Sequence, residues 1–139
     1  MDARKTTKLS GQTIVNLLHQ PMKEKTKIWL GAIAVLDGGY VTPGRTGTGL
    51  VAIGIAEETI DNTTGADGAI FAPIRQGTFL FYNSGGTDAI TQADVGKDAF
   101  IVDDQTVAKT DDTGKRSRAG RIVQIEPTGM VWVQLGIGF

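Results

Sequence analysis

The 139-residue sequence has no cysteine and one histidine, His19. The missing cysteines exclude disulfide scaffolds, thiolate zinc sites, iron–sulfur clusters and cysteine nucleophiles. A histidine-based metal site or a Ser–His triad would have to use His19, which we interpret as a contact or surface residue. These shortages argue against catalysis. We expect a protein that is not an enzyme, with no metal and no cofactor.

Long apolar runs are also missing. The longest, Ile28–Leu36, is broken by Gly31 and is far too short to cross a bilayer. The first residues, MDARKTTKLSGQT, are polar and charged and lack the apolar segment of a signal peptide. We therefore expect synthesis in the cytoplasm and no membrane partner.

Glycine, by contrast, is abundant, with 19 residues against an average usage of about 7%. From residue 26 onward, short runs rich in Val, Ile and Thr alternate with Gly, Pro and Asp turn signals. This pattern is typical of an all-β protein, and we expect a compact small β-barrel or β-sandwich. The predicted strands are Lys27–Leu36, Tyr40–Thr42, Leu50–Ala56, Ala69–Ile74, Thr78–Tyr82, Ala99–Val102, Thr106–Ala108, Arg121–Ile125 and Met130–Leu135. The strands Ala99–Val102 and Thr106–Ala108 are expected to form a hairpin around Asp103-Asp104-Gln105.

Charge is distributed unevenly along the chain. Residues 1–30 hold six basic and two acidic residues, a net charge of +4, whereas the remaining eight basic and thirteen acidic residues give −5. We divide the chain into a basic N-terminal arm, residues 1–25, and a β-rich domain, residues 26–139. The arm either contacts a negatively charged surface or is a solvated terminus. Nucleic acid is not expected, because the arm has no interleaved aromatics and the domain is acidic.

One short helix is predicted inside the extended arm. Ser10 could cap it, Ile14, Leu17 and Leu18 fall on one side at helical spacing, and Pro21 ends it. A helix of about ten residues is marginal alone in water. Its apolar side therefore needs a partner surface.

Two motifs resemble catalytic or cofactor-binding signatures but lack the burial or the flanking strand and helix that those signatures require. Asp112-Thr113-Gly114 is the tripeptide of retroviral-type aspartic proteases, which need it in a buried apolar setting. Here charged residues flank it on both sides, which indicates a solvated turn. The segment 47–52, GTGLVA, fits G-x-G-x-x-A, but no strand precedes it and no helix follows it.

Aspartates are concentrated in one third of the chain. Their oxygens could bind calcium, although the EF-hand spacing is absent, and turn formation explains the same residues. Whether these loops bind calcium stays open. The residues are Asp94, Asp98, Asp103, Asp104, Asp111 and Asp112.

Four aromatic residues on predicted strands are candidates for the core or for an oligomer interface: Trp29, Phe79, Phe81 and Trp132. Cross-strand packing is the simpler interpretation. A sugar-binding aromatic platform is the functional alternative for one or two of the aromatics.

The order of these segments resembles a known family. Residues 50–57 read LVAIGIAE, residues 76–83 read QGTFLFYN and residues 93–108 read ADVGKDAFIVDDQTVA; AGRIV at 119–123 and MVWVQL at 130–135 follow. Over about residues 26–136, this pattern is similar to the capsid decoration (cement) proteins of tailed double-stranded-DNA bacteriophages.

The resemblance implies a compact β-fold, barrel-like or tulip-like, that assembles as a homotrimer or a dimer. It implies a structural role in the virion, on the outer surface of the expanded head, where such proteins tie neighbouring subunits of the major capsid protein together against the pressure of internal DNA. In that setting Arg4, Lys5 and Lys8 would meet acidic capsid groups, and Ile14, Leu17 and Leu18 would fill an apolar groove.

Two other classes of function stay open. A tail- or fibre-associated carbohydrate-binding β module would carry exposed aromatics. A small carboxylate enzyme would need two acids with displaced pKa values in one cleft.

Overall fold

The computed structural model describes residues 16–137, which form twelve strands and two single-turn 3-10 helices. The strands are β1 (Leu17–Pro21), β2 (Thr26–Ile28), β3 (Ile33–Asp37), β4 (Tyr40–Pro43), β5 (Val51–Ala56), β6 (Ile60–Asn62), β7 (Phe71–Arg75), β8 (Gly77–Asn83), β9 (Asp98–Ile101), β10 (Thr106–Ala108), β11 (Arg118–Ile125) and β12 (Val131–Leu135), and the 3-10 turns are η1 (Gly86–Asp88) and η2 (Gln92–Asp94). The all-β prediction is confirmed.

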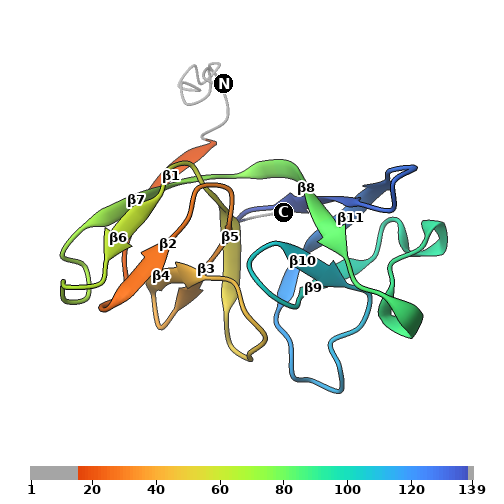
Figure 1. Ribbon diagram of the computed structural model, residues 1–139, viewed down its shortest axis with the longest axis horizontal. Helices are drawn as coiled ribbons and strands as arrows, with labels where there is room; N and C mark the ends of the chain where they lie inside the picture. Colours follow the sequence, from red (N-terminus) through yellow and green to blue (C-terminus); the bar gives the residue numbers. More distant parts are fainter. Residues whose placement is uncertain (1–15, 138–139) are drawn as a thin grey trace, which may run out of the picture.

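The strands form two lobes that lie side by side (Figure 1). In the first lobe, β1-β7-β5-β3-β4 form an antiparallel sheet, accompanied by the pair β2–β6. In the second, β10-β8-β12-β11-β9 close into a small barrel. Strands β8 and β10 pair in parallel, whereas the other barrel pairs are antiparallel. Strands β7 and β8 follow each other across the top of the view and connect the lobes (Figure 1).

The two outer strands of the first sheet are brought together by Met22. Directly after β1, Met22 bridges Val41 of β4, and the Lys23 N–H donates to the Val41 carbonyl at 3.1 Å. The Met22 side chain is fully buried in a cluster with Ile28, Val41, Ile53 of β5 and Ile74 of β7. The first sheet therefore wraps around a core of its own.

Strands β3 and β5 contribute to both cores. Ile33 and Val35 belong to the barrel core, whereas Ala34 between them faces the core of the first sheet. On β5, Ile53 is buried in the first core, and Ile55 packs against the barrel core. A strand buried on both faces needs apolar residues at successive positions, which explains the unalternating runs of these two strands.

The predicted helix is wrong for its C-terminal part. Residues Leu17–Pro21 form β1, which pairs with β7 from Leu17 opposite Arg75 to Pro21 opposite Phe71. The apolar spacing at residues 14–18 is that of a helix, but pairing of Leu17–Pro21 with β7 makes this segment a strand. Residues 17–22 thus belong to the β body and not to an arm that ends at residue 25. Ser10 and Ile14 lie outside the described residues.

The predicted strand Lys27–Leu36 is two strands. The chain turns between β2 and β3, where Gly31 adopts a φ of +86°. That conformation favours glycine, because a side chain there meets the backbone. As a result Trp29 and Leu30 lie at an exposed corner and not inside a strand.

An ion pair joins two loops at the end of the barrel. Arg116 Nη1 donates to Asp88 Oδ2 at 2.8 Å and to the Thr110 carbonyl at 3.0 Å, and the Thr110 hydroxyl donates to Asp88. The hydroxyl of Thr110 and the guanidinium of Arg116 hold the pKa of Asp88 below its ordinary value.

Asp88→Asn is expected to reduce stability in a pH-dependent way. Because the pKa of Asp88 is depressed in the fold, its contribution is present above its ordinary unfolded pKa and is lost as the pH falls through the lower folded pKa. The variant should lose about 1–2 kcal/mol of unfolding free energy at pH 7. Urea titrations at pH 7 and pH 2.5 should show the difference shrinking at low pH. Asp37→Asn, in a more exposed pair with Arg45, is the control and should cost about 0–1 kcal/mol at pH 7.

Candidate interaction site

The four predicted aromatic residues take three different positions. Phe81 is 3% exposed in the barrel core, and Phe79 packs against that core. Trp132 is half-buried on the outside of the barrel, where its Nε1 donates to Glu126 Oε2 at 2.8 Å. Trp29 is 57% exposed and contributes to neither core. A core role is therefore excluded for Trp29, and its role in an oligomer stays a prediction.

The predicted capsid-binding residues fall into two groups. Arg4, Lys5, Lys8 and Ile14 lie outside the described residues. Leu17 and Leu18 are both half-buried on β1, and Leu18 packs against the first core. Pairing with β7 places both residues in the fold, and their role in capsid binding stays a prediction.

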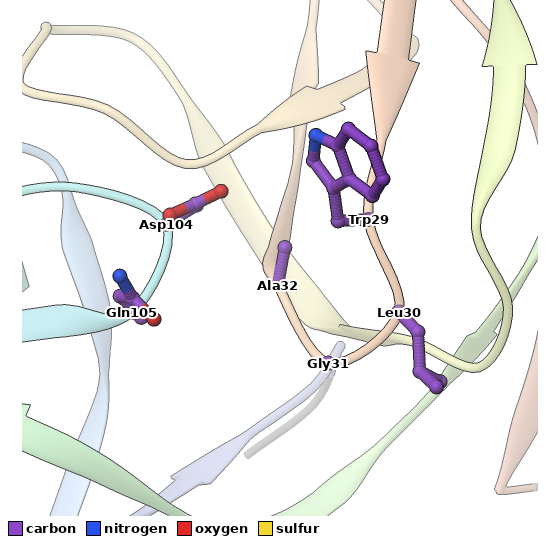
Figure 2. Close-up of a pocket in the computed structure, with 6 residues that line it drawn as sticks. All are labelled: Trp29, Leu30, Gly31, Ala32, Asp104 and Gln105. Atoms are coloured by element: carbon purple, nitrogen blue, oxygen red, sulfur yellow. The ribbon is translucent and has the colours of Figure 1, made fainter.

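The exposed corner at Trp29 forms one wall of a hollow of about 300 Å³ (Figure 2). Trp29 and Leu30 lie on the β2 side, Gly31 and Ala32 follow them, and Asp104 and Gln105 lie on the opposite turn between β9 and β10. The Ile33 N–H donates to the Asp104 carbonyl at 2.7 Å. That bond ties the two turns together, although they come from different lobes.

Backbone hydrogen bonds hold the Trp29 corner in place. The Ala32 N–H donates to the Trp29 carbonyl at 3.0 Å, and the Gly31 N–H donates to the Ala56 carbonyl at 2.9 Å. The Leu30 N–H donates to the Thr59 hydroxyl at 3.0 Å. The corner is therefore built on a fixed backbone.

A cation lies against the exposed indole. Lys27 Nζ is 3.8 Å from the centroid of the Trp29 ring, within the range of a cation–π contact. The contact restrains both side chains. More than half of the Trp29 surface stays open to solvent nonetheless.

The carboxyl of Asp104 has an unusual environment. Burial raises its pKa, and the neighbouring charge of Asp103 raises it further. Asp103 itself accepts a hydrogen bond from the Gln105 N–H at 2.9 Å, which shapes the turn. The hollow thus combines an aromatic ring, a partly desolvated carboxyl group and an amide, and the Lys27 ammonium group lies against the ring.

A second exposed apolar surface lies on the outside of the barrel, and we name it the outer barrel patch. Along β8 the buried Phe81 alternates with Leu80 and Tyr82, which are 36% and 53% exposed. Leu80 lies opposite Trp132 on β12, and Val123, at a register shift in β11, is 43% exposed. The outer barrel patch consists of Leu80, Tyr82, Val123 and Trp132.

The clustered aspartates do not form a metal site in the described part of the chain. Asp94 accepts hydrogen bonds from the Thr91 N–H and hydroxyl, and Asp98 pairs with Arg118 at 2.7 Å. Within residues 16–137 no three His, Asp or Glu side chains gather where one metal ion could bind them. The carboxylates of Asp94 and Asp103 fix loops, and that of Asp98 joins β9 to β11.

Sequence reasoning did not place Leu30, Asp104 or Gln105 beside Trp29. It did identify the Asp103-Asp104-Gln105 segment as the turn of a hairpin, and β9 and β10 flank that turn as predicted. The signal it lacked is the long-range bond between Ile33 and Asp104, which decides what the turn faces.

Comparisons of the chain with protein-family models, curated proteins and solved structures found no match in any of the three. Within the described residues, no helix is long and apolar enough to span a membrane.

Proposed function

We propose that the protein is a capsid decoration protein, which binds the outer surface of an expanded phage head and ties neighbouring capsid subunits together. The resemblance of residues 26–136 to the cement proteins suggests this role. The observation that carries it is the outer barrel patch, where large apolar side chains project from paired strands of a closed barrel. Exposed apolar patches of this kind are typical of protein–protein interfaces.

The architecture supports a binding role in a second way. The patch residues alternate with buried residues of the same strands, so the core holds them in position. A preordered surface loses little conformational entropy on binding. The patch is suited either to a capsid subunit or to a second copy of the chain, in a trimer or a dimer.

The basic arm adds a further contact in this proposal. Arg4, Lys5 and Lys8 would bind acidic capsid groups. Several arms in one oligomer would raise avidity by factors of about 10² to 10⁴. Because residues 17–22 belong to the fold, the arm that can be removed without damaging the β body ends at residue 15.

Co-sedimentation with expanded and unexpanded cognate shells tests the proposal. Saturable binding to expanded shells alone is the expected result, with at least tenfold weaker binding for a protein that lacks residues 1–15. Unchanged affinity of the shortened protein would overturn the arm's role. No binding of the full chain to either shell would overturn the decoration function and favour the alternative, a tail- or fibre-associated carbohydrate-binding module.

A charged side chain introduced into the outer barrel patch should weaken binding through that patch. Leu80→Glu is expected to weaken shell binding or self-association at least tenfold, because binding would bury an unpaired carboxylate. Thr78→Glu is the matched control, since Thr78 is exposed on the same face of β8, two residues away. Analytical ultracentrifugation separates the loss of self-association from the loss of shell binding. Equal binding by both variants would contradict an interface at the patch.

A further inference from the structure

We propose that the hollow between the β2–β3 turn and the β9–β10 turn binds a neutral saccharide, with a sugar ring stacked on Trp29 and its hydroxyls bonded to Asp104 and Gln105. This site is separate from the outer barrel patch. It does not depend on capsid binding.

The first argument is the aromatic platform. Trp29 is 57% exposed at a corner whose backbone is fixed by hydrogen bonds at Leu30, Gly31 and Ala32. Lys27 lies over the ring at 3.8 Å and restrains its orientation. A large aromatic side chain usually gains stability from burial. A restrained indole left open to solvent is instead ready to stack against the C–H face of a sugar.

The second argument is the polar wall. Figure 2 shows the Asp104 carboxyl and the nitrogen edge of the Trp29 indole facing each other across the hollow, with Gln105 next to Asp104. In the described chain, neither the Asp104 carboxyl nor the Gln105 amide forms a hydrogen bond or ion pair with another residue's side chain or backbone. A carboxylate accepts hydrogen bonds, and an amide donates and accepts them. Together they complement sugar hydroxyls, which also do both.

The charges around the hollow select against other ligand classes. A cationic ligand would meet Lys27, which already occupies the ring as its cation. An anionic ligand would be repelled by the neighbouring carboxyl groups of Asp103 and Asp104. A purely apolar ligand would desolvate that carboxyl without a hydrogen bond in return. A neutral polyhydroxyl compound satisfies all these groups.

The size of the hollow sets the expected affinity. About 300 Å³ is at the lower end of small-molecule sites, so the hollow holds a short stretch of a glycan. A ligand of this size with few contacts is expected to bind with a Kd on the order of 1 mM. Repetition of the site over many copies would raise the avidity.

The two tryptophans provide an internal control for the test. Indole N–H resonances of the ¹⁵N-labelled full chain are followed during titration with cellotetraose, maltotetraose, chitotetraose and mannotetraose up to 20 mM. The expected result is a saturable shift of the Trp29 resonance with at least one of them, while Trp132 stays unchanged. No Trp29 shift with any of the four, or an equal shift at Trp132, would overturn the proposal.

Variants assign the contacts. Trp29→Ala, at an exposed position, should keep the melting temperature within a few degrees of that of the unchanged protein. It should abolish the shifts that the glycan causes in the backbone amide resonances. Asp104→Ala should weaken binding at least tenfold, whereas Phe71→Ala, which removes an aromatic ring that is 56% exposed and does not line the hollow, should change it less than threefold. Unchanged binding by folded Trp29→Ala would overturn the site. Tighter binding of tetralysine or of tetragalacturonate than of the neutral glycans would overturn the ligand class.

Discussion

Gly54→Ala is expected to lower the free energy of unfolding by about 2–6 kcal/mol, the sum of backbone strain and overpacking. Gly54 lies in β5 with a φ of +147°, and a Cβ there would overlap the Arg75 carbonyl. Its partner is Ala34, and the register of β3 and β5 shifts immediately beyond that pair. The glycine thus permits a bulge in a strand that is shared by both cores.

The control for this experiment is Gly38→Ala. Gly38 also has a positive φ, +62°, but no atom lies within 4 Å of where its Cβ would be. The Gly38→Ala variant therefore measures the cost of placing a side chain at a positive φ without a steric overlap, about 1–2 kcal/mol. Urea unfolding of both variants, followed by tryptophan fluorescence, gives the comparison. Equal losses of unfolding free energy in the two variants would show that the overlap with the Arg75 carbonyl adds nothing to the cost of Gly54→Ala.

Met22→Ala is expected to cost about 2–5 kcal/mol, the range for removing a fully buried large side chain. Met22 is 0% exposed and joins β1 to β4 by its bridge to Val41. Truncation leaves a cavity among Ile28, Val41 and their neighbours at the point where the first sheet closes. Thermal unfolding of the purified variant measures the loss.

Removal of residues 1–15 is the matched comparison for Met22→Ala. It leaves β1 and Met22 in place, so the melting temperature should change by less than about 3 °C, whereas Met22→Ala should lower it by about 8 °C or more. A marginal effect of Met22→Ala would contradict tight packing of its side chain in the first core.

The strand content could be predicted because the local signals and the pairing agree over most of the chain. Val107 and Phe100 lie on the predicted hairpin arms, and the Asp-rich turn between them is where the sequence placed it. At Leu17 and Leu18 the local pattern is that of a helix, and only the distant β7 decides for a strand. Near Trp29, one glycine ends a strand that the apolar run alone would continue.

The candidate saccharide site could be predicted only in part. An exposed aromatic platform was an open alternative for Trp29, but its polar partners were not identified. Asp104 and Gln105 are distant in sequence and reach Trp29 through one backbone bond between the lobes, from Ile33 to Asp104. No periodicity or spacing in the chain encodes that approach, because it depends on how the first sheet packs against the barrel.

The sharing of β3 and β5 between the two cores affects how the protein is made. During synthesis the first sheet can assemble once β7 has left the ribosome, well before the barrel is complete. Until β12 emerges, Ile33, Val35 and Ile55 lack their barrel contacts. The nascent chain therefore presents an uncovered apolar face, of the kind that chaperones bind and that aggregates when synthesis is fast.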